Sequence, residues 1–341
     1  MTLSTSEISV TFLALFLLLM FSYLFGKLFE AIKAPKVVGE IVGGMIVGGS
    51  CIGYFFPDFF NSIFYAYPEE GKVLNIFYQL GLVFLMFSSG YNTSINITKK
   101  TFKNYGFLFI GATIIPMLLG LPFVKLFTVD FIGTENNKIA FTIVFLISVA
   151  ITSIPVISKI FFDIGMMNTK FSNMVLTVST LQDLCLWILL NLSISLVETG
   201  EFTISTFLIT TAITIGLLFA AKLVEKFVKS KNIKISKDIL TISFLVLFAI
   251  IYLLSKLNVN IMYSAFIGGY LMKAILPEDN KKIAKIKDFA MSLFVPVYFA
   301  LVGIQLDVVN HFSLSRFLLF FCYCIWVGIY WHGIYVVVYQ I

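Results

Sequence analysis

The segment STLQDLCLWILL, residues 179–190, places a carboxylate in the middle of an otherwise apolar run. That residue is Asp183, and apolar or weakly polar residues flank it on both sides. A charged side chain at the centre of a membrane helix costs roughly 3 kcal/mol even on the mildest insertion scale, so such residues usually face a bundle interior or a water-filled path. The alternative is a capping or loop aspartate that only looks buried. The remainder of the chain decides between these two interpretations.

The composition is that of an integral membrane protein. Of the 341 residues, 59% are hydrophobic and only 12% are charged, and the mean hydropathy is +0.98. Soluble globular proteins carry about 25% charged residues. The net charge of +6 resides mainly in lysines that lie between apolar runs, so it indicates membrane topology rather than a nucleic-acid partner.

Apolar runs long enough to cross a bilayer recur along the whole chain, since a helix needs about 20 apolar residues to do so. We identify eleven of them, which predicts an all-α, polytopic membrane protein. The first run lacks a basic leader and a small-residue cleavage site, which favours a retained span over a signal peptide. The predicted spans are residues 8–26, 37–56, 73–92, 104–127, 139–161, 171–196, 202–221, 239–255, 257–276, 289–306 and 317–339.

Lys and Arg residues are distributed unevenly between the loops that alternate along these spans. Nineteen lie on one side and five on the other. The positive-inside rule then places the Lys-rich loops in the cytoplasm and the N-terminus outside, which predicts a multi-pass protein of the cell membrane. Residues 1–341 are expected to form one transmembrane domain. Its longest basic link, 222–238, would join a first repeat at 1–196 to a partial second repeat at 202–341.

Two acidic residues within the spans have different interpretations. Glu40 lies one turn into the second span, just after Lys36. A carboxylate near a helix N-terminus and the interface there has a structural role. Asp183 has no such explanation, and we favour a functional role for it. Burial disfavours a charged carboxylate whereas a bound cation favours it, so one carboxylate that holds either a proton or a cation is the minimal device for exchange.

The preceding span, FTIVFLISVAITSIPVISKIFF at residues 141–162, contains Thr152, Ser153 and Pro155 deep within it. Proline removes a helix hydrogen bond and clashes with the preceding turn. Backbone groups freed in a membrane are tolerated only where protein or a water-filled cavity satisfies them. Discontinuous helices of this kind supply carbonyl groups to the ion sites of secondary transporters. A simple proline kink is the alternative, but beside a span with a central carboxylate we favour a broken helix.

The second span carries closely spaced glycines. In PKVVGEIVGGMIVGGS, residues 35–50, Gly39 and Gly43 begin a series of small residues four apart. Such spacing lets membrane helices approach closely, so we expect a packing role for these glycines. A glycine-rich phosphate loop is not expected, because no strand and no Lys-Ser/Thr pair accompanies them.

Two segments resemble each other as the halves of an inverted repeat do. LMFSSGYNTS at 85–94 is similar to YFALVGIQLD at 298–307, which aligns Gly90 with Gly303 at an offset of 213 residues. The same offset would place a counterpart of Thr152 beyond residue 341. We therefore expect the second broken helix to be missing. The aromatic-rich tail at 322–341 suggests a truncation or a frameshift near residue 320; an ordinary last span is the alternative.

Five segments, in this order, resemble the monovalent cation:proton antiporter superfamily, specifically its second branch. They are APKVVGEIVGGMIVGGS, LGLVFLMFSSGYN, TSIPVISKIFFDIGMMNT, LQDLCLWILL and FVPVYFALVGIQLD. That branch includes sodium/proton antiporters and glutathione-gated potassium efflux antiporters. The resemblance runs from about residue 8 to 310. It implies a thirteen-span inverted-repeat fold with a discontinuous helix, a dimerising scaffold and a mobile core that carries the ion.

The resemblance also implies roles for individual residues. Asp183 matches the carboxylate that alternately binds cation and proton, while Thr152 and Ser153 match the unwound crossover helix. We expect the cation- and proton-binding site to consist of Asp183, Gln182, Thr152 and Ser153. Gln182 stands where electrogenic relatives have a second Asp and where potassium efflux relatives have Gln. With one titratable carboxylate the exchange would be electroneutral, and Gln182 favours K⁺ with Na⁺ left open. The chain departs from the family in its last segment, which has no Lys or Arg beside the expected crossing.

Together these features predict a secondary active transporter that exchanges K⁺ or Na⁺ for H⁺ by alternating access. The expected partners are the cation, the proton, the lipid bilayer and a second copy in a homodimer. The alternatives are a transport-inactive antiporter remnant and a solute symporter on a related fold. An enzyme is not expected, because the four cysteines lack metal-ligand spacing and the two histidines have no nucleophile or carboxylate motif beside them. We expect no cofactor and no metal beyond the transported cation.

Overall fold

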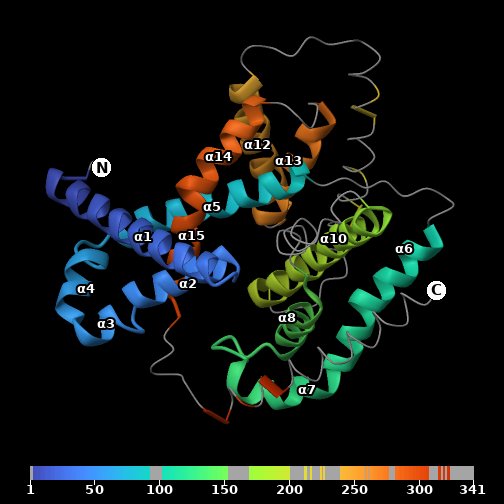
Figure 1. Cartoon of the computed structure of the whole chain (residues 1–341), viewed down its shortest axis with the longest axis horizontal. Helices are drawn as coiled ribbons and strands as arrows, with labels where there is room; N and C mark the ends of the chain where they lie inside the picture. Colours follow the sequence, from blue (N-terminus) through green and yellow to red (C-terminus); the bar gives the residue numbers. More distant parts are fainter. Residues whose placement is uncertain are drawn as a thin grey trace. The chain divides into compact units, whose positions relative to one another are not determined.

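The computed structural model describes residues 3–92, 102–152, 169–199, 239–257, 259, 261–275 and 281–306, with isolated residues between 211 and 226 and between 314 and 322. Every regular element in these ranges is a helix (Figure 1). The chain divides into two compact units, which are treated separately below. The first comprises residues 1–90, 234–248 and 276–318, and the second residues 91–233, 249–275 and 319–341.

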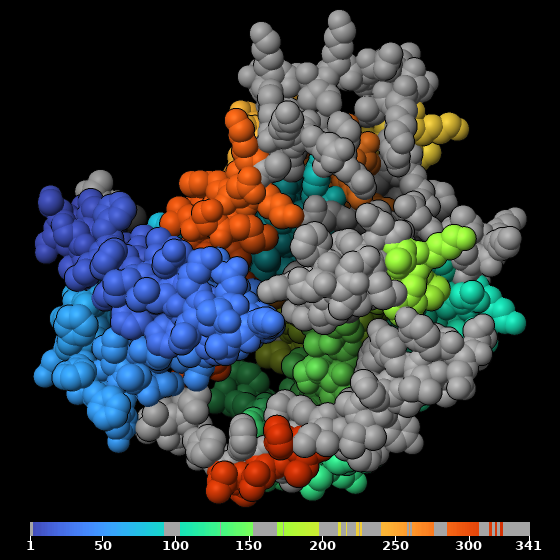
Figure 2. All heavy atoms as spheres, in the orientation of Figure 1, coloured from blue at the N-terminus to red at the C-terminus, as the bar shows by residue number. Residues whose placement is uncertain are grey.

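The first unit is built mainly from the N-terminal helices and two later ones. Its core joins small and branched side chains of α1, α2 and α15, including Ala14, Leu18, Val47 and Val297, all at most 1% exposed. The helices are α1 (Thr5–Ala31), α2 (Lys36–Val47), α3 (Ile52–Phe55), α4 (Pro57–Phe64), most of α5 (Glu70–Asn92), the first part of α12 (Ile239–Ser255), α14 (Lys281–Ser292) and α15 (Phe294–Ile304). The atoms of α1 and α2, in blue, pack without a visible gap (Figure 2).

Local signals explain how α1 begins and ends. Ser4 caps its first turn: the Ser4 hydroxyl accepts from the Glu7 backbone N–H, and the Glu7 carboxylate accepts from the Ser4 N–H. This reciprocal arrangement satisfies two backbone donors that a helix start leaves free. After Ile32, the backbone at Lys33 takes a positive φ of 61°. That conformation ends the helix and turns the chain into α2.

The glycines of α2 lie against backbone on two neighbouring helices. A Cβ on Gly43 would lie 2.5 Å from the Phe21 carbonyl oxygen in α1. A Cβ on Gly39 would likewise overlap the Phe25 carbonyl oxygen. Gly44 faces the Ala300 carbonyl of α15, and a Cβ on Gly48 would lie 2.7 Å from the Ile304 Cα. No side chain fits at these contacts, so the glycines allow α2 to touch α1 and α15 directly.

The second unit contains the segment around Asp183. It comprises α6 (Phe102–Phe109), a π-helix η1 (Ile110–Ile114), α7 (Ile115–Phe131), α8 (Lys138–Ala150), α10 (Lys170–Thr199), the end of α12 and α13 (Ile261–Ile275). Apolar side chains join α10 to α8 through two clusters, one around Leu192 and Leu196 and one around Leu186 and Ile147. A further cluster of Phe127 and Phe145 joins α7 to α8.

Polar side chains also form hydrogen bonds between α8 and α10. Asn137 caps α8 by accepting from the Ala140 N–H at 3.0 Å, and its amide nitrogen donates to the Leu196 carbonyl at 3.0 Å. The Ser193 hydroxyl donates to the Ala140 carbonyl, also at 3.0 Å. These bonds set the axial register of α10 against α8.

The described helices confirm an all-α membrane protein. Six are long and apolar enough to cross a bilayer: Thr5–Ala31, Lys36–Phe55, Glu70–Tyr91, Lys103–Val129, Lys170–Val197 and Lys285–Ile304. Three shorter apolar helices, Lys138–Ala150, Leu240–Ser255 and Ile261–Ile275, fall in three more of the predicted runs. The runs 202–221 and 317–339 lie almost wholly outside the described residues. The count of eleven spans therefore stays a prediction.

Candidate cation and proton site

Asp183 lies in the middle of α10, between the buried residues Gln182 and Leu184. Its own side chain is only partly buried. Within the described part of the chain, the carboxylate forms neither a hydrogen bond nor an ion pair. Asp183 is not a helix cap and is not neutralised by a described Lys or Arg. It is the kind of carboxylate that a proton or a cation can occupy.

Gln182 has a different environment, because it is 1% exposed and fully hydrogen-bonded through its amide nitrogen. Nε2 donates to the Ala150 carbonyl at 2.6 Å and to the Ala112 carbonyl at 3.1 Å. An amide nitrogen has two hydrogens. Both are therefore used on backbone oxygens of other helices, one at the end of α8 and one in η1.

The two carbonyls lie at irregular points of their helices, one in a π-helical bulge between α6 and α7 and one at the end of α8. In an α-helix the Ala112 carbonyl would accept from the N–H of residue 116, but that residue is Pro116 and has no N–H. The backbone there takes the wider π-helical turn, a form that occurs mostly as single bulges inside helices. The Ala150 carbonyl belongs to the last turn of α8, where helix carbonyls have no partner within the helix.

Thr152 lies just past the end of α8 and next to this junction. The backbone at Ile151 is extended, with φ −61° and ψ 135°, so the helix stops inside the apolar run 139–161. The half-buried Thr152 hydroxyl lies 3.5 Å from the Ala150 carbonyl, the same oxygen that Gln182 contacts. The structure thus brings Thr152 and Gln182 together. Ser153 and Pro155 lie outside the described residues.

Hydroxyl groups line the helix turns before Asp183. Thr177, Ser179 and Thr180 are all at most 7% exposed. The Thr180 hydroxyl donates to the Leu176 carbonyl at 3.0 Å, so it is satisfied within the helix. These residues make α10 polar along one side in its middle, in an otherwise apolar sequence.

Reasoning from the sequence missed the π-helix and its part in the site. Thr113, inside η1, is 2% exposed, and its hydroxyl has no hydrogen-bond partner among the described residues. The available signal was the pair of prolines at 116 and 122 in one predicted span. Proline indicates a helix irregularity but not which carbonyl it leaves free.

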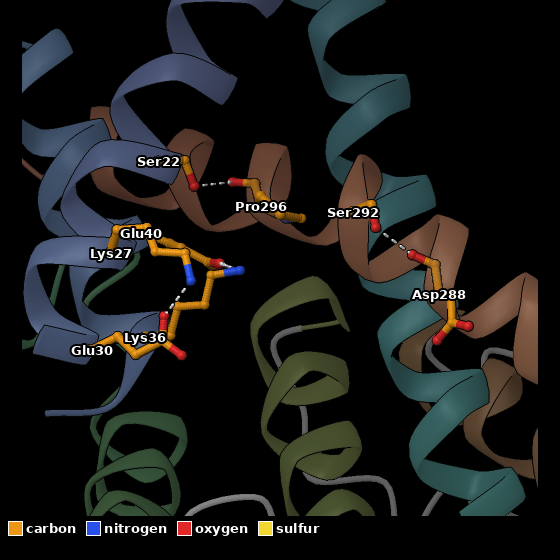
Figure 3. A network of polar contacts seen from close by, with 8 residues as sticks. All are labelled: Ser22, Lys27, Glu30, Lys36, Glu40, Asp288, Ser292 and Pro296. Atoms are coloured by element: carbon orange, nitrogen blue, oxygen red, sulfur yellow. Dashed lines mark hydrogen bonds and ion pairs between the residues drawn. The ribbon is translucent and has the colours of Figure 1, made fainter. Parts of the chain in front are cut away.

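The remaining predicted residues lie in the first unit. Glu40 is 4% exposed and pairs with Lys36, whose Nζ lies 3.3 Å from the Glu40 carboxylate (Figure 3). Gly39 and Gly43 are at the α1 contact described above. Gly303 lies against the backbone of α2, where a Cβ would come 2.8 Å from the Met45 nitrogen. The structure places these residues in helix packing.

Comparison with known proteins adds a family. The model of the sodium/hydrogen exchanger transmembrane family matches residues 15–340. K(+)/H(+) antiporter 1 of Saccharomyces cerevisiae is 26% identical over 297 residues, covering 82% of this chain. Na(+)/H(+) antiporter NhaS4 of Synechocystis is 26% identical over 299 residues, covering 84% of this chain and 70% of the relative. Cation/H(+) antiporter 17 of Arabidopsis thaliana is 24% identical over 298 residues, covering 86% of this chain.

The matched regions differ in how much of each relative they represent. This chain spans about a third of the yeast and Arabidopsis relatives, at 33% and 36% of their lengths. The match therefore concerns only part of each of these two relatives.

Proposed function

This chain belongs to the sodium/hydrogen exchanger family, and from that premise we propose that it is a secondary active transporter that exchanges a monovalent cation, K⁺ or Na⁺, for a proton. The names of its relatives support this assignment, since they include K⁺/H⁺, Na⁺/H⁺ and cation/H⁺ antiporters. The presence of six membrane-competent helices is consistent with a multi-pass membrane protein.

The observation that carries the proposal is the state of Asp183. Its carboxylate lies in the middle of an apolar helix without a described partner, next to Gln182, which bonds to the π-helix η1 and to the end of α8. A carboxylate without a partner can bind either a proton or a cation through the same oxygens. Thr152 supplies a hydroxyl near the end of α8. We assign Asp183 as the exchange group, with Thr152 and Ser153 as further oxygen ligands.

The neutral side chain at position 182 sets the charge of the site. With one carboxylate, each cation that leaves is replaced by one proton, so no net charge crosses the membrane in a cycle. We therefore propose electroneutral exchange. Gln182 favours K⁺ as the cation, and Na⁺ is the competitor to be tested beside it.

We also propose how the site is used. Alternating access would expose Asp183 to one side of the membrane at a time, as in transporters built from inverted repeats. The repeats would be residues 1–196 and 202–341, and the protein would act as a homodimer in the cell membrane. The Lys-rich loops would face the cytoplasm and the N-terminus the outside.

Transport in everted membrane vesicles tests the proposal. Addition of K⁺ or Na⁺ to vesicles that hold an acid interior should release protons in wild type and not in Asp183→Asn. Glu135→Gln, an exposed carboxylate between α7 and α8, is the matched control and should transport as wild type does. Undiminished exchange by Asp183→Asn would refute the site.

The same vesicles separate the rival functions. A symporter would accumulate its solute with an inward proton gradient, and counterflow with and without that gradient distinguishes it from an antiporter. An inactive remnant would show no cation-dependent proton movement at all. Imposing a membrane potential checks the stoichiometry, because an electroneutral exchanger keeps the same rate.

A further inference from the structure

Gln182 joins three helical segments through one amide group. Its Nε2 hydrogens bind the Ala112 carbonyl in η1 and the Ala150 carbonyl at the end of α8, while its backbone belongs to α10. The residue is buried; its bond to the Ala150 carbonyl is buried as well, and its bond to the Ala112 carbonyl is partly buried. Buried backbone carbonyls are costly to leave unpaired. Here one side chain donates to two backbone carbonyls at once.

The chemistry of the amide decides what Gln182 can do in exchange. A nitrogen that carries hydrogens repels a cation, and both hydrogens are directed at backbone oxygens. The two carbonyls are in turn occupied, so neither is freely available as a cation ligand. Gln182 therefore acts on the site indirectly, through the position that it gives to the helix carrying Asp183.

We propose that Gln182 is a positioning residue: its amide clamps the helix that carries Asp183 to the π-helix η1 and to the end of α8, and so fixes the arrangement of oxygens around Asp183. This inference rests on the proposed function of Asp183 as the exchange group. It replaces a direct ligand role for Gln182 with a structural constraint on the site. A carboxylate introduced at position 182 would therefore remove these hydrogen bonds as well as add a charge.

The π-helix shows a second sign of the same constraint. Four threonine hydroxyls elsewhere in the described helices donate to the carbonyl four residues earlier: those of Thr11, Thr128, Thr142 and Thr180. Thr113 in η1 is buried but its hydroxyl makes no such bond. Thr113 lies in the π-helical turn, whereas the other four lie in α-helices. The segment has an irregular backbone, and Gln182 donates to its Ala112 carbonyl.

Two variants of Gln182 distinguish a positioning role from direct binding of the cation. Gln182→Glu keeps the shape but replaces the two donors by a carboxylate, which faces two carbonyl oxygens. When it is protonated, the introduced carboxyl group can still donate to one of them. We expect the transport rate of this variant, relative to wild type at the same pH, to be about 10- to 100-fold lower in alkaline buffer and to recover on acidification. Exchange should stay insensitive to membrane potential.

Gln182→Met keeps the length and removes both donors. We expect a lower maximal rate together with a changed ratio of KM for K⁺ to KM for Na⁺, because the oxygens around Asp183 lose their fixed positions. A variant that only folded less well would lower the maximal rate and leave that ratio unchanged. That result, or a Gln182→Glu protein with wild-type rates and a new dependence on membrane potential, would overturn the proposal.

Thermal unfolding of the purified proteins tests the clamp without transport. The midpoint of Gln182→Glu, relative to wild type, should fall as pH rises, since the ionised form faces two carbonyls. If the difference in unfolding midpoint between Gln182→Glu and wild type were the same at acid and alkaline pH, the positioning role of Gln182 would be contradicted. If wild type moved no protons but the midpoint difference changed with pH, the proposed function would fail and the positioning role of Gln182 would remain supported. If Asp183→Asn abolished exchange and the difference were absent, the clamp alone would fail.

Discussion

The two units of this protein hold their helices together in different ways. In the first unit, α2 meets α1 and α15 through glycines that lie directly against backbone, as at Gly43 and Gly44. In the second unit, α10 is tied to its neighbours by side chains that bond to backbone carbonyls, as with Gln182 and Ser193. The first arrangement depends on the absence of side chains. The second depends on particular side-chain donors that reach backbone carbonyls of neighbouring helices.

The comparison predicts which substitutions each unit tolerates. The glycine contacts should fail on the addition of any volume, because backbone cannot move aside. The polar contacts should lose a limited amount for each bond removed, since neighbouring apolar clusters remain. The following variants test this contrast in order of decreasing expected effect on stability.

Gly44→Val should have the largest effect. Its side chain would overlap the Ala300 carbonyl, and overpacking of this kind costs on the order of 3 kcal/mol or more. We expect little folded protein in detergent extracts, measured by size-exclusion chromatography of a fluorescent fusion. Gly49→Ala is the control, because a Cβ there meets nothing within 4 Å. A monodisperse Gly44→Val protein at wild-type yield would show that α2 and α15 are not in backbone contact.

Asn137→Ala should come next, in the second unit. It removes both the cap of α8 and the bond to the Leu196 carbonyl, at a cost of about 1–2 kcal/mol. The thermal midpoint measures the loss. Asn137→Asp keeps the capping oxygen but not the amide donor, so it should lose only part of this stability. Equal losses in the two variants would mean that the cap contributes nothing.

Lys36→Met should have a smaller effect in the first unit. It leaves the buried Glu40 without its ion-pair partner, but Lys36 is itself 46% exposed, so we expect about 1 kcal/mol. Lys27→Met is the matched control, since the Lys27–Glu30 pair is exposed at both ends, at 55% and 48%. A drop in thermal midpoint for Lys27→Met as large as that for Lys36→Met would show that the burial of Glu40 does not matter.

Thr113→Val should have the smallest effect. The hydroxyl it removes is buried without a partner among the described residues, so its loss is close to neutral or slightly stabilising. A clear fall in the thermal midpoint, comparable to that of Asn137→Ala, would instead reveal a bound water or another partner for Thr113. The measurement therefore shows whether the Thr113 hydroxyl in η1 is unpaired or has a partner.

The sequence allowed the membrane class, the helical fold and the family to be predicted. Apolar runs and sparse charge are local properties, and the glycine spacing in α2 is visible within a single turn. Asp183 was identifiable for the same reason, because a carboxylate in an apolar run needs no partner to be noticed. The family match over residues 15–340 confirmed the resemblance that these segments suggested.

The junction around Gln182 could not be predicted in the same way. Its partners lie 70 and 32 residues away in the chain, and they are backbone atoms that carry no sequence signature. Pro116 marks a helix irregularity, but the π-helical turn depends on how the neighbouring helices pack. The burial of Glu40 likewise depends on packing, because a position one turn into a span does not say which helices cover it.

The glycine contacts of α2 also have an entropic consequence. Membrane helices form before they associate, so the cost of ordering the glycine backbone is already met when α2 meets its neighbours. Glycine then has no rotamers to lose, whereas a leucine or methionine at the same place would lose side-chain freedom. The contact of α2 with α1 and α15 therefore orders no side chain at its closest points. Its strength should decline less on warming than that of an interface packed by long side chains.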